Sequence, residues 1–528
     1  MTTAYPPPQL TAFEGIRRIA SGPPSLVAAK VREVLSKGEA APVLVFDDLT
    51  GMQIDLDLRQ LPEKSPAMPA QELMEPRSAG RPRLGVVARE VTLLPRHWDW
   101  LGQQRGGGSA ALRRLIDQAR RQSVGEEAKR AAREAVYRFM TAMAGDAPGY
   151  EEALRALFAG NAGRFSSLTS EWAADVREHI WRLAPAAFGF ASSPLDGVIP
   201  FAKLEAVLHA TGTAFGAAEI ESAERITKGA SGAGIFKITV DRVEYLLRIE
   251  GPPDGLRDPA RQYTCMRIAA EAGVAPRVIY ANAGHGVAII GYIQSKSAQT
   301  KRAREESLPA VVTAVKKLHA APLFPALVEY FEGVGMLIRR CQATRILPKN
   351  ILAKYLKIYE ELAAVYPRRD AELVSSHNDL NPGNVLFGSE QAWLVDWEAA
   401  FAADPYVDLA ALTNFFAESE SDKEVILQCY FGAATSDVHR VRLFLMQQVN
   451  RIFYAMVILN FVAAARPETK LTASDIKEAK FSEVRGELGQ VSTVEIKILL
   501  ACALLNGVAQ DCQSSKFREA LALMTIST

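Results

Sequence analysis

The sequence has few cysteines, almost no net charge and no long apolar run, and each of these deficits excludes a class of protein. Its 528 residues include five cysteines with no CxxC pair, which excludes a dense disulfide framework and a cysteine-rich zinc site. Lys and Arg number 61 against 60 Asp and Glu, so the chain as a whole is not built to bind a polyanion. The longest apolar runs, such as 452–465, fall short of the ~20 residues that cross a bilayer.

We therefore expect a cytoplasmic protein without a membrane partner. The first residues, MTTAYPPPQL, contain neither the basic nor the apolar region of a secretory signal, and scattered cysteines are typical of a reducing compartment. With 48% hydrophobic and 23% charged residues, the composition is that of ordinary globular domains. The length predicts two or three such domains.

Two stretches rich in proline and small residues divide the chain. The first, at 61–83, is interpreted as a linker between a small α+β unit at 1–60 and a mostly helical region at 84–190. The second precedes a strand-rich region predicted at 200–293 and a helical region at 294–528. The predicted fold class is α+β throughout.

The 1–60 unit has readable local patterns. TAFEGIRRIASG predicts a hairpin and SLVAAKVREVLSKG an amphipathic helix. APVLVFD and MQIDLDLR alternate as strands do, and an Asp-Leu-Thr-Gly turn joins them. Together these patterns predict a small α+β unit.

The most informative segment of the chain is SSHNDLNPGNVLF. Asp379 follows His377 by two positions and Asn384 follows Asp379 by five, which is the spacing of an aspartate base and an asparagine metal ligand on one catalytic loop. Phosphoryl transfer needs a carboxylate that orients the attacking hydroxyl and ligands that hold Mg²⁺ on the phosphates. The segment therefore predicts phosphotransferase chemistry, and the run 385–387 predicts the strand that leaves the loop.

Two further acids lie downstream of this loop. Asp396 follows the apolar strand AWLV, where a carboxylate is costly unless it is paired or coordinated to a cation, so a metal ligand is the favoured interpretation. Asp408, in DPYVDLA, is interpreted as a structural acid that ties down the catalytic loop. The alternative for the whole cluster is a coincidental acidic turn beside a buried strand.

The segment from Glu224 to Cys502 resembles the aminoglycoside phosphotransferase and choline/ethanolamine kinase superfamily, and HNDLNPGNVLF and WLVDWE are closest to its choline kinase-like bacterial branch. The resemblance implies a two-lobed protein-kinase-like fold that uses ATP and Mg²⁺. It also implies a role for four residues of the loop region: Asp379 as catalytic base, Asn384 and Asp396 as Mg²⁺ ligands, and His377 as a brace of the loop.

A glycine-rich segment, KGASGAGIFKI, lies upstream between two predicted strands. Gly229, Gly232 and Gly234 would let backbone N–H groups approach phosphates closely, and Ser231 could add a hydroxyl contact. Glycines between strands are by themselves more often plain turn residues. Ahead of a kinase-like loop they predict a phosphate cradle.

Arg248, in EYLLRIEG, stands where most kinases have a phosphate-binding lysine, and the resemblance indicates that choline kinase-like proteins often use arginine there. A guanidinium can hold the α- and β-phosphates, and the alternative is a solvated arginine at a strand end. The family usually pairs this cation with a glutamate from the next helix, where Gln262 stands here. An amide can donate or accept hydrogen bonds but supplies no negative charge to hold the arginine in place for catalysis. The alternative function is therefore a nucleotide-binding pseudokinase that acts as a regulator.

The sequence gives less specific signals for the residues that contact adenine and the acceptor than for those of the catalytic loop. GVAIIGYIQ is the expected hinge strand, and Ile290 and Tyr292 are placed beside adenine by position alone. Glu398 could bind an ammonium group or a hydroxyl of the acceptor. The helical region is rich in aromatic residues, which attract amines through cation–π contacts, although such residues more often pack a core. The predicted acceptor is a choline/ethanolamine-like or aminoglycoside-like small molecule.

Residues 10–183 resemble an uncharacterised bacterial domain family through LTAFEG, APVLVFDD and VTLLPRHWDWL, and this resemblance implies no activity. Within it, 88–121 has the strand, helix, turn and helix order of a ribbon-helix-helix protein. Ser109 is the expected cap of the second helix, and Ile116 is expected on its apolar face.

Residues 81–121 carry nine arginines against three acids, a balance of +6 that could neutralise nucleic-acid phosphates. In a ribbon-helix-helix dimer, however, Glu90 and Leu94 would point outward with Thr92, and a carboxylate and a leucine read bases poorly. The alternative is a module for homodimerisation or packing.

Overall fold

The computed structural model describes residues 9–38, 41–56, 91–104, 107–190, 193–216, 218–226, 233–251, 258–294, 301–388, 391–484 and 493–527. The chain forms two compact units, Met1–Glu205 and Ala206–Thr528. The division falls inside one helix, α7 (Phe201–Phe215).

The N-terminal unit begins with a small antiparallel sheet of order β2-β1-β3, formed by β1 (Leu10–Glu14), β2 (Arg17–Gly22) and β3 (Val43–Asp47). The expected hairpin is therefore confirmed. Helix α1 (Pro24–Lys37) packs against β1 and β2 and buries Val27 and Val31, as its amphipathic pattern predicts. The segment after β3 makes a single bridge from Gln53 to Phe46, where the alternating pattern predicted a second strand.

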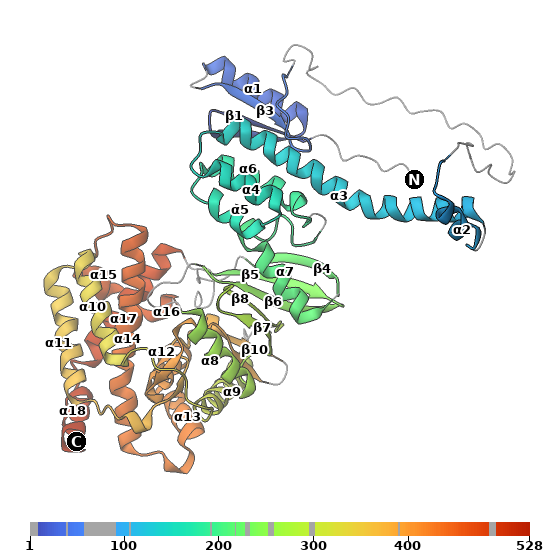
Figure 1. The fold of residues 1–528 in the computed structure, drawn as a ribbon. Helices are drawn as coiled ribbons and strands as arrows, with labels where there is room; N and C mark the ends of the chain where they lie inside the picture. The colour runs from blue at the N-terminus through green and yellow to red at the C-terminus, as the bar shows by residue number, and fades with distance from the viewer. Residues whose placement is uncertain are drawn as a thin grey trace, which may run out of the picture. The chain divides into compact units, whose positions relative to one another are not determined.

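Helices complete this unit: α2 (Pro95–Gly102), α3 (Gly108–Ala144), α4 (Tyr150–Ala159), α5 (Ala162–Thr169) and α6 (Ala174–Ala187). Figure 1 shows that α3 packs along α6 and α4 over one part of its length, while its N-terminal part runs on to α2. Phe13 and Phe46 of the sheet meet Phe139 of α3 in edge-to-face and tilted ring contacts. This aromatic cluster joins the sheet to the helices.

The 88–121 segment has part of its expected form. Its two helices are present, but Gly107 occupies the N-cap position of α3 and Ser109 lies inside the helix, so the predicted cap is wrong. Residues 91–94 are not paired as a strand, and the side chain of Ile116 is 55% exposed, so it packs against no core in the single chain. A ribbon-helix-helix strand pairs only between two chains, so that arrangement stays a prediction.

The C-terminal unit opens with a five-stranded antiparallel sheet of order β4-β5-β6-β8-β7. Its strands are β4 (Ile220–Ile226), β5 (Gly234–Val240), β6 (Val243–Ile249), β7 (Val278–Asn282) and β8 (Val287–Gly291), and α8 (Pro259–Glu271) lies between β6 and β7 in the sequence. Asp258 caps α8 by accepting a hydrogen bond from the N–H of Ala260 at 2.9 Å, and Pro259 occupies the first helical position, where its missing N–H costs nothing.

A helical lobe follows, with two short strand pairs at its border with the sheet. Strand β9 (Val374–Ser376) pairs with β12 (Phe401–Ala403), and β10 (Val385–Phe387) pairs with β11 (Ala392–Leu394). The lobe consists of α9 (Lys301–His319), α10 (Tyr330–Thr344), α11 (Lys349–Val365), α12 (Pro405–Phe416), α13 (Glu420–Phe431), α14 (Asp437–Ala465), α15 (Ala473–Glu478), α16 (Phe481–Val484), α17 (Val494–Asp511) and α18 (Ser515–Ser527). This order of a sheet-based lobe and a helical lobe is the two-lobed protein-kinase-like fold that the sequence predicted.

Helix α14 is long and apolar enough to cross a membrane by length and composition, and no other helix of the described residues is. It packs against α10, α12 and α17, and 56% of its most apolar window is buried within the lobe. Four polar residues within five positions also make contacts inside the lobe: the buried Gln447, Gln448 and Asn450 and the half-buried Arg451. These features are typical of a core helix.

A histidine lies inside the aromatic cluster of the N-terminal unit. The ring of His179 is fully buried, 4.3 Å from that of Phe139, and burial together with the charges of Arg182 and Arg18 lowers its pKa to about 3. Arg182 donates to its Nδ1 at 2.9 Å, which leaves the ring proton on Nε2, 3.7 Å from Asp48 Oδ1. The folded unit therefore keeps this imidazole neutral at pH values where an unfolded chain would protonate it.

We predict that the N-terminal unit loses stability as the pH falls below about 6.5. Below this pH the imidazole of His179 binds a proton in the unfolded chain but not in the folded chain. The free energy of unfolding should therefore fall by up to about 1.4 kcal/mol for each pH unit. Urea denaturation at pH 7.5, 6.5 and 5.5 measures this slope. In His179→Gln the slope should disappear over the same range, and an unchanged slope would contradict the prediction. The raised pKa of Asp48, which burial causes, acts in the opposite sense.

Candidate active site

The loop between β9 and β10 is anchored by a buried carboxylate. Asp408, in the first turn of α12, accepts hydrogen bonds from the backbone N–H groups of His377 and Asn378, each at 2.8 Å, and from Nε2 of His319 at 3.0 Å. Burial alone would raise the pKa of Asp408, but His319 and His377 outweigh it and lower the pKa. The expected role of Asp408 as the acid that ties down the loop is confirmed by these contacts.

The next residue of the loop adopts an uncommon backbone conformation. Asn378 has φ +63°, and its Nδ2 donates to three carbonyl oxygens, those of Ser376, Ala399 and Phe401, at 3.1–3.3 Å. Asparagine tolerates this left-handed region better than other non-glycine residues, and the four hydrogen bonds of its backbone and side chain hold it there. Asn378 thus turns the chain so that Asp379 leaves the buried strand and faces the border between the lobes.

Asp379 is held by three donors. Its Oδ1 accepts from the hydroxyl of Tyr454 at 2.9 Å and from Nδ2 of Asn381 at 3.0 Å, and its Oδ2 accepts from Nδ2 of Asn384 at 2.9 Å. Burial raises the pKa of Asp379 and Asp396 adds to the rise, while hydrogen bonds from Asn381 and Tyr454 and the charge of His377 oppose it. The carboxylate is therefore fixed in direction and more basic than an exposed aspartate.

His377 supports the loop from behind. Its Nε2 donates to the carbonyl oxygen of Val395 at 2.9 Å, and its ring lies 4.7 Å from that of Trp397. The side chain is fully buried, so it does not face solvent. This geometry links the loop to the segment that carries Asp396.

Asn384 and Asp396 lie in adjoining segments, because the N–H of Val395 donates to the carbonyl of Asn384 at 3.0 Å. Since Nδ2 of Asn384 is already engaged with Asp379, its amide oxygen is the atom that remains for a cation. Oδ1 of Asp396 is buried and accepts no hydrogen bond. Two oxygen ligands of this kind suit Mg²⁺, which takes few protein ligands and completes its shell with water and phosphate.

Other cation-binding groups do not compete for this role. No group of three or more histidine, cysteine, aspartate and glutamate side chains gathers within the described ranges as a metal cluster would. The five cysteines, all of them in described parts of the chain, are unpaired. The residues present at Asn384 and Asp396 therefore fit Mg²⁺ held on a phosphate better than a dedicated protein cage for another metal.

Arg248, near the end of β6, lies among three carboxylates. Its Nε donates to Glu250 Oε1 at 2.6 Å, its Nη1 lies 3.2 Å from Asp396 Oδ1, and its Nη2 donates to Glu398 Oε1. Burial lowers the pKa of Arg248, but the three acids outweigh it and raise the pKa. The side chain is only 7% exposed, so the alternative of a solvated strand-end arginine is wrong.

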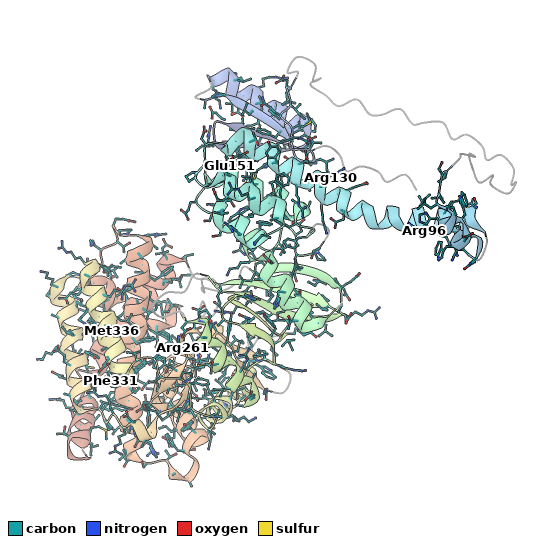
Figure 2. All side chains as sticks on the ribbon, viewed as in Figure 1. Arg96, Arg130, Glu151, Arg261, Phe331 and Met336 are labelled. Carbon is teal, nitrogen blue, oxygen red and sulfur yellow. The ribbon has the colours of Figure 1, made fainter. Side chains whose placement is uncertain are left out.

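Helix α8 reaches this cluster with two side chains. Gln262, which is 3% exposed, donates from Nε2 to Glu250 Oε1 at 3.1 Å. Arg261, labelled in Figure 2, donates to the backbone carbonyls of Ala400 and Glu398, the latter at 2.8 Å. The helix is thereby fixed to the segment that follows Asp396.

The remaining predicted nucleotide contacts lie on the sheet or outside the described residues. Gly229, Ser231 and Gly232 belong to the undescribed part. At Gly234, opposite Ile249, an added Cβ would lie 2.9 Å from the ring of Phe236, so a larger residue there would require this buried ring to shift.

The predicted hinge residues lie at the end of β8. Ile290 pairs with Leu246 in the sheet, and the N–H of Tyr292 is directed at the carbonyl of Glu244 at 3.4 Å. That donor is occupied within the sheet, so adenine would have to be read by other backbone groups of this strand end. The hinge assignment stays a prediction.

Aromatic side chains gather beside Asp379. Tyr454 contacts the rings of Phe415 at 4.7 Å and Phe453 at 5.2 Å, and Phe453 lies 5.5 Å from Tyr330. The tyrosine hydroxyl thus joins an apolar wall to the carboxylate. The sequence singled out the aromatic residues of this lobe, but not the hydrogen bond of Tyr454 to Asp379.

Glu250 is one of the site residues that the sequence analysis did not predict, together with Asn378, His319 and Tyr454. A signal for Glu250 was present, because residues two apart on a strand lie on the same face, and Arg248 and Glu250 have this spacing. The family usually has the partner of this arginine on the helix, whereas here the acid lies two residues after the arginine itself.

Comparisons with known proteins agree with this architecture. Residues 222–444 match the model of a phosphotransferase enzyme family, and residues 9–184 match that of an uncharacterised protein family conserved in bacteria. No curated protein matches this chain significantly.

Three solved structures illustrate the similarity. A choline/ethanolamine kinase family protein from Mesorhizobium loti is 22% identical, with 61% of this chain and 98% of that chain covered and a TM-score of 0.47. Choline kinase from Streptococcus pneumoniae is 15% identical, with 58% and 98% covered and a TM-score of 0.42. A spectinomycin phosphotransferase in complex with ADP and spectinomycin is 11% identical, with 57% and 98% covered and a TM-score of 0.38.

We predict that Asp408→Asn destabilises the C-terminal unit by about 3–5 kcal/mol. The substitution removes the charge that two backbone N–H groups and His319 share, and it can place an amide N–H against one of these donors. Urea denaturation followed by circular dichroism measures the loss. The matched control is Asp437→Asn, whose side chain is 92% exposed and which should change the free energy by less than about 0.5 kcal/mol. Equal effects of the two variants would contradict the anchoring role.

Proposed function

We propose that this chain, in which residues 222–444 match a phosphotransferase enzyme family, transfers the γ-phosphoryl group of ATP to a hydroxyl of a small molecule. The observation that supports this best is the convergence of Asp379, Asn384 and Asp396. One hydrogen bond joins the first two side chains at 2.9 Å, and the backbone bond from Val395 to Asn384 holds the third beside them. Phosphoryl transfer requires these three groups together.

Asp379 is the general base of the proposed reaction. Its carboxylate would accept the proton of the acceptor hydroxyl as the oxygen attacks the γ-phosphorus. Three donors fix its direction, and its raised pKa brings it closer to the basicity that proton transfer needs near neutral pH. His377 does not touch the acceptor and would act by bracing the loop.

Asn384 and Asp396 would hold Mg²⁺, which supplies charge neutralisation at the β- and γ-phosphates when bound. Arg248 would hold the α- and β-phosphates from the sheet side. One guanidinium among three carboxylates leaves surplus negative charge in the site, which a divalent cation would balance. Gly234, with the glycines before it, would bring backbone N–H groups to the same phosphates.

The acceptor is proposed to be an amino alcohol or an aminated sugar-like compound, that is, a choline/ethanolamine-like or aminoglycoside-like molecule. The wall of Phe415, Phe453 and Tyr454 beside Asp379 supports an amine through cation–π attraction. Glu398, with its carboxylate 22% exposed, supplies a nearby negative charge, although Arg248 already takes part of it. A cytoplasmic location accords with the use of ATP and with unpaired cysteines.

We predict that Asp379→Asn lowers kcat by about 10²–10⁴-fold, because the amide cannot accept the proton of the hydroxyl. Release of ADP by the purified chain over a panel of choline, ethanolamine and aminoglycosides is the measurement. Asp370→Asn, an exposed acid of the same lobe, is the control and should retain full activity. Nucleotide binding by the wild-type chain without turnover on any acceptor would instead favour the pseudokinase alternative.

A separate prediction concerns the cation. At a Mg²⁺-ATP concentration of roughly 100 Kd, the melting temperature of the wild-type chain should rise by about 5 °C, and Asp396→Asn should lose most of this rise because one Mg²⁺ ligand is neutralised. Differential scanning fluorimetry with and without EDTA measures both effects. A full rise in the variant, or a rise in the wild type that EDTA leaves intact, would refute the assignment of Asp396.

A further inference from the structure

We infer that Glu250, the residue directly after strand β6, is the acidic residue that positions Arg248 for the nucleotide, in place of the helical glutamate whose position Gln262 occupies. The inference rests on the proposed function, since it concerns the phosphate-binding arginine of that site. Glu250 is a positioning residue: it acts on the phosphates through Arg248 and contacts no substrate itself.

The two side chains lie two positions apart on one extended stretch of backbone, Arg248 near the end of β6 and Glu250 directly after it. Because strand residues alternate between faces, Arg248 and Glu250 point the same way, and Nε of the arginine donates to Oε1 of the glutamate at 2.6 Å. The exposed fraction is 7% for Arg248 and 6% for Glu250. A buried ion pair that is hydrogen-bonded in this way is strong and well oriented, because little water competes with it.

The backbone under the pair is rigid. Arg248 pairs with Ile235 of β5 on one side and with Ala288 of β8 on the other, so β6 lies inside the sheet at this point. The N–H of Glu250 donates to the carbonyl of Gly286 at 2.8 Å, which continues the pairing beyond the end of β6. The position of the carboxylate is thus set by the sheet and not by a helix.

Gln262 completes the arrangement as a donor. Its Nε2 reaches the same oxygen, Oε1 of Glu250, at 3.1 Å. A glutamate at 262 would place a second carboxylate against that of Glu250 and would be repelled by it. The amide at 262 and the acid at 250 are therefore complementary, and the absence of the helical acid follows from the presence of the strand acid.

The other two acids around Arg248 have different tasks. Asp396 is a proposed Mg²⁺ ligand, and Glu398 lies on the acceptor side of the site. When Asp396 holds a cation, its attraction for Arg248 weakens, and Glu250 is then the partner that still restrains the guanidinium. Gln262 favoured a pseudokinase because an amide supplies no negative charge to Arg248. Glu250 supplies that charge instead, so this argument for a pseudokinase no longer applies.

The test uses the full-length chain and three variants: Glu250→Gln, the double variant Glu250→Gln/Gln262→Glu, and Glu271→Gln as a matched control at the exposed end of α8. Calorimetry with Mg²⁺ and a non-hydrolysable ATP analogue gives the Kd of each. Turnover of an acceptor found in the panel gives kcat and the KM for ATP and for the acceptor.

We expect Glu250→Gln to weaken nucleotide binding about tenfold and to lower kcat/KM for ATP about a hundredfold, while KM for the acceptor stays the same. The double variant returns the carboxylate to the helix and should regain most of both losses, and Glu271→Gln should match the wild type. Glu250→Asp, which keeps the charge but withdraws it by one methylene, should fall between the wild type and Glu250→Gln.

Two results would overturn the inference. One is a Glu250→Gln chain that binds the analogue as tightly as the wild type. The other is a double variant that is folded by circular dichroism and binds no better than Glu250→Gln, since a merely structural role of Glu250 would not be rescued from another element. Nucleotide affinities in the expected order without turnover on any acceptor would instead refute the proposed function and leave this inference standing.

Discussion

A single buried negative charge organises the catalytic loop. Asp408 lies at the start of α12 with no exposed surface, and it is stabilised there because two backbone N–H groups and one imidazole donate to it. Those hydrogen bonds determine where His377 and Asn378 lie, and the left-handed turn at Asn378 then determines where Asp379 points. The proposed chemistry at Asp379 thus depends on a charge that is shielded from solvent.

The C-terminal site was largely predictable, because its chemistry demands particular residues at short spacings. Asp379 and Asn384 belong to one loop and Asp396 follows the next strand, so the sequence alone places all three near one another. The partner of Arg248 was not predicted, because it depends on which of two elements supplies the acid. Related proteins usually have this acid on the helix, which favoured position 262. The alternation of side chains along extended backbone instead places Glu250 on the same side as Arg248.

The N-terminal unit was predictable only in its local patterns. The hairpin and α1 follow from alternation and amphipathic spacing. The 37-residue length of α3 does not follow from local pattern, because its apolar residues form no continuous stripe along the helix. Packing against α6 stabilises part of this helix, and such tertiary contacts cannot be read from local spacing. The aromatic cluster joins Phe139 to Phe46 and Phe13, which lie 93 and 126 positions earlier in the chain, and no local spacing reveals it.

The pairing of Arg248 with Glu250 bears on how activity could be controlled. In protein kinases the corresponding ion pair joins a strand to a movable helix, and displacing that helix switches the enzyme off. Here both charges belong to one stretch of backbone, so no displacement of α8 can separate them. An enzyme of this design could not be switched off by separating this arginine from its acid through a movement of the helix, so any control would have to act elsewhere.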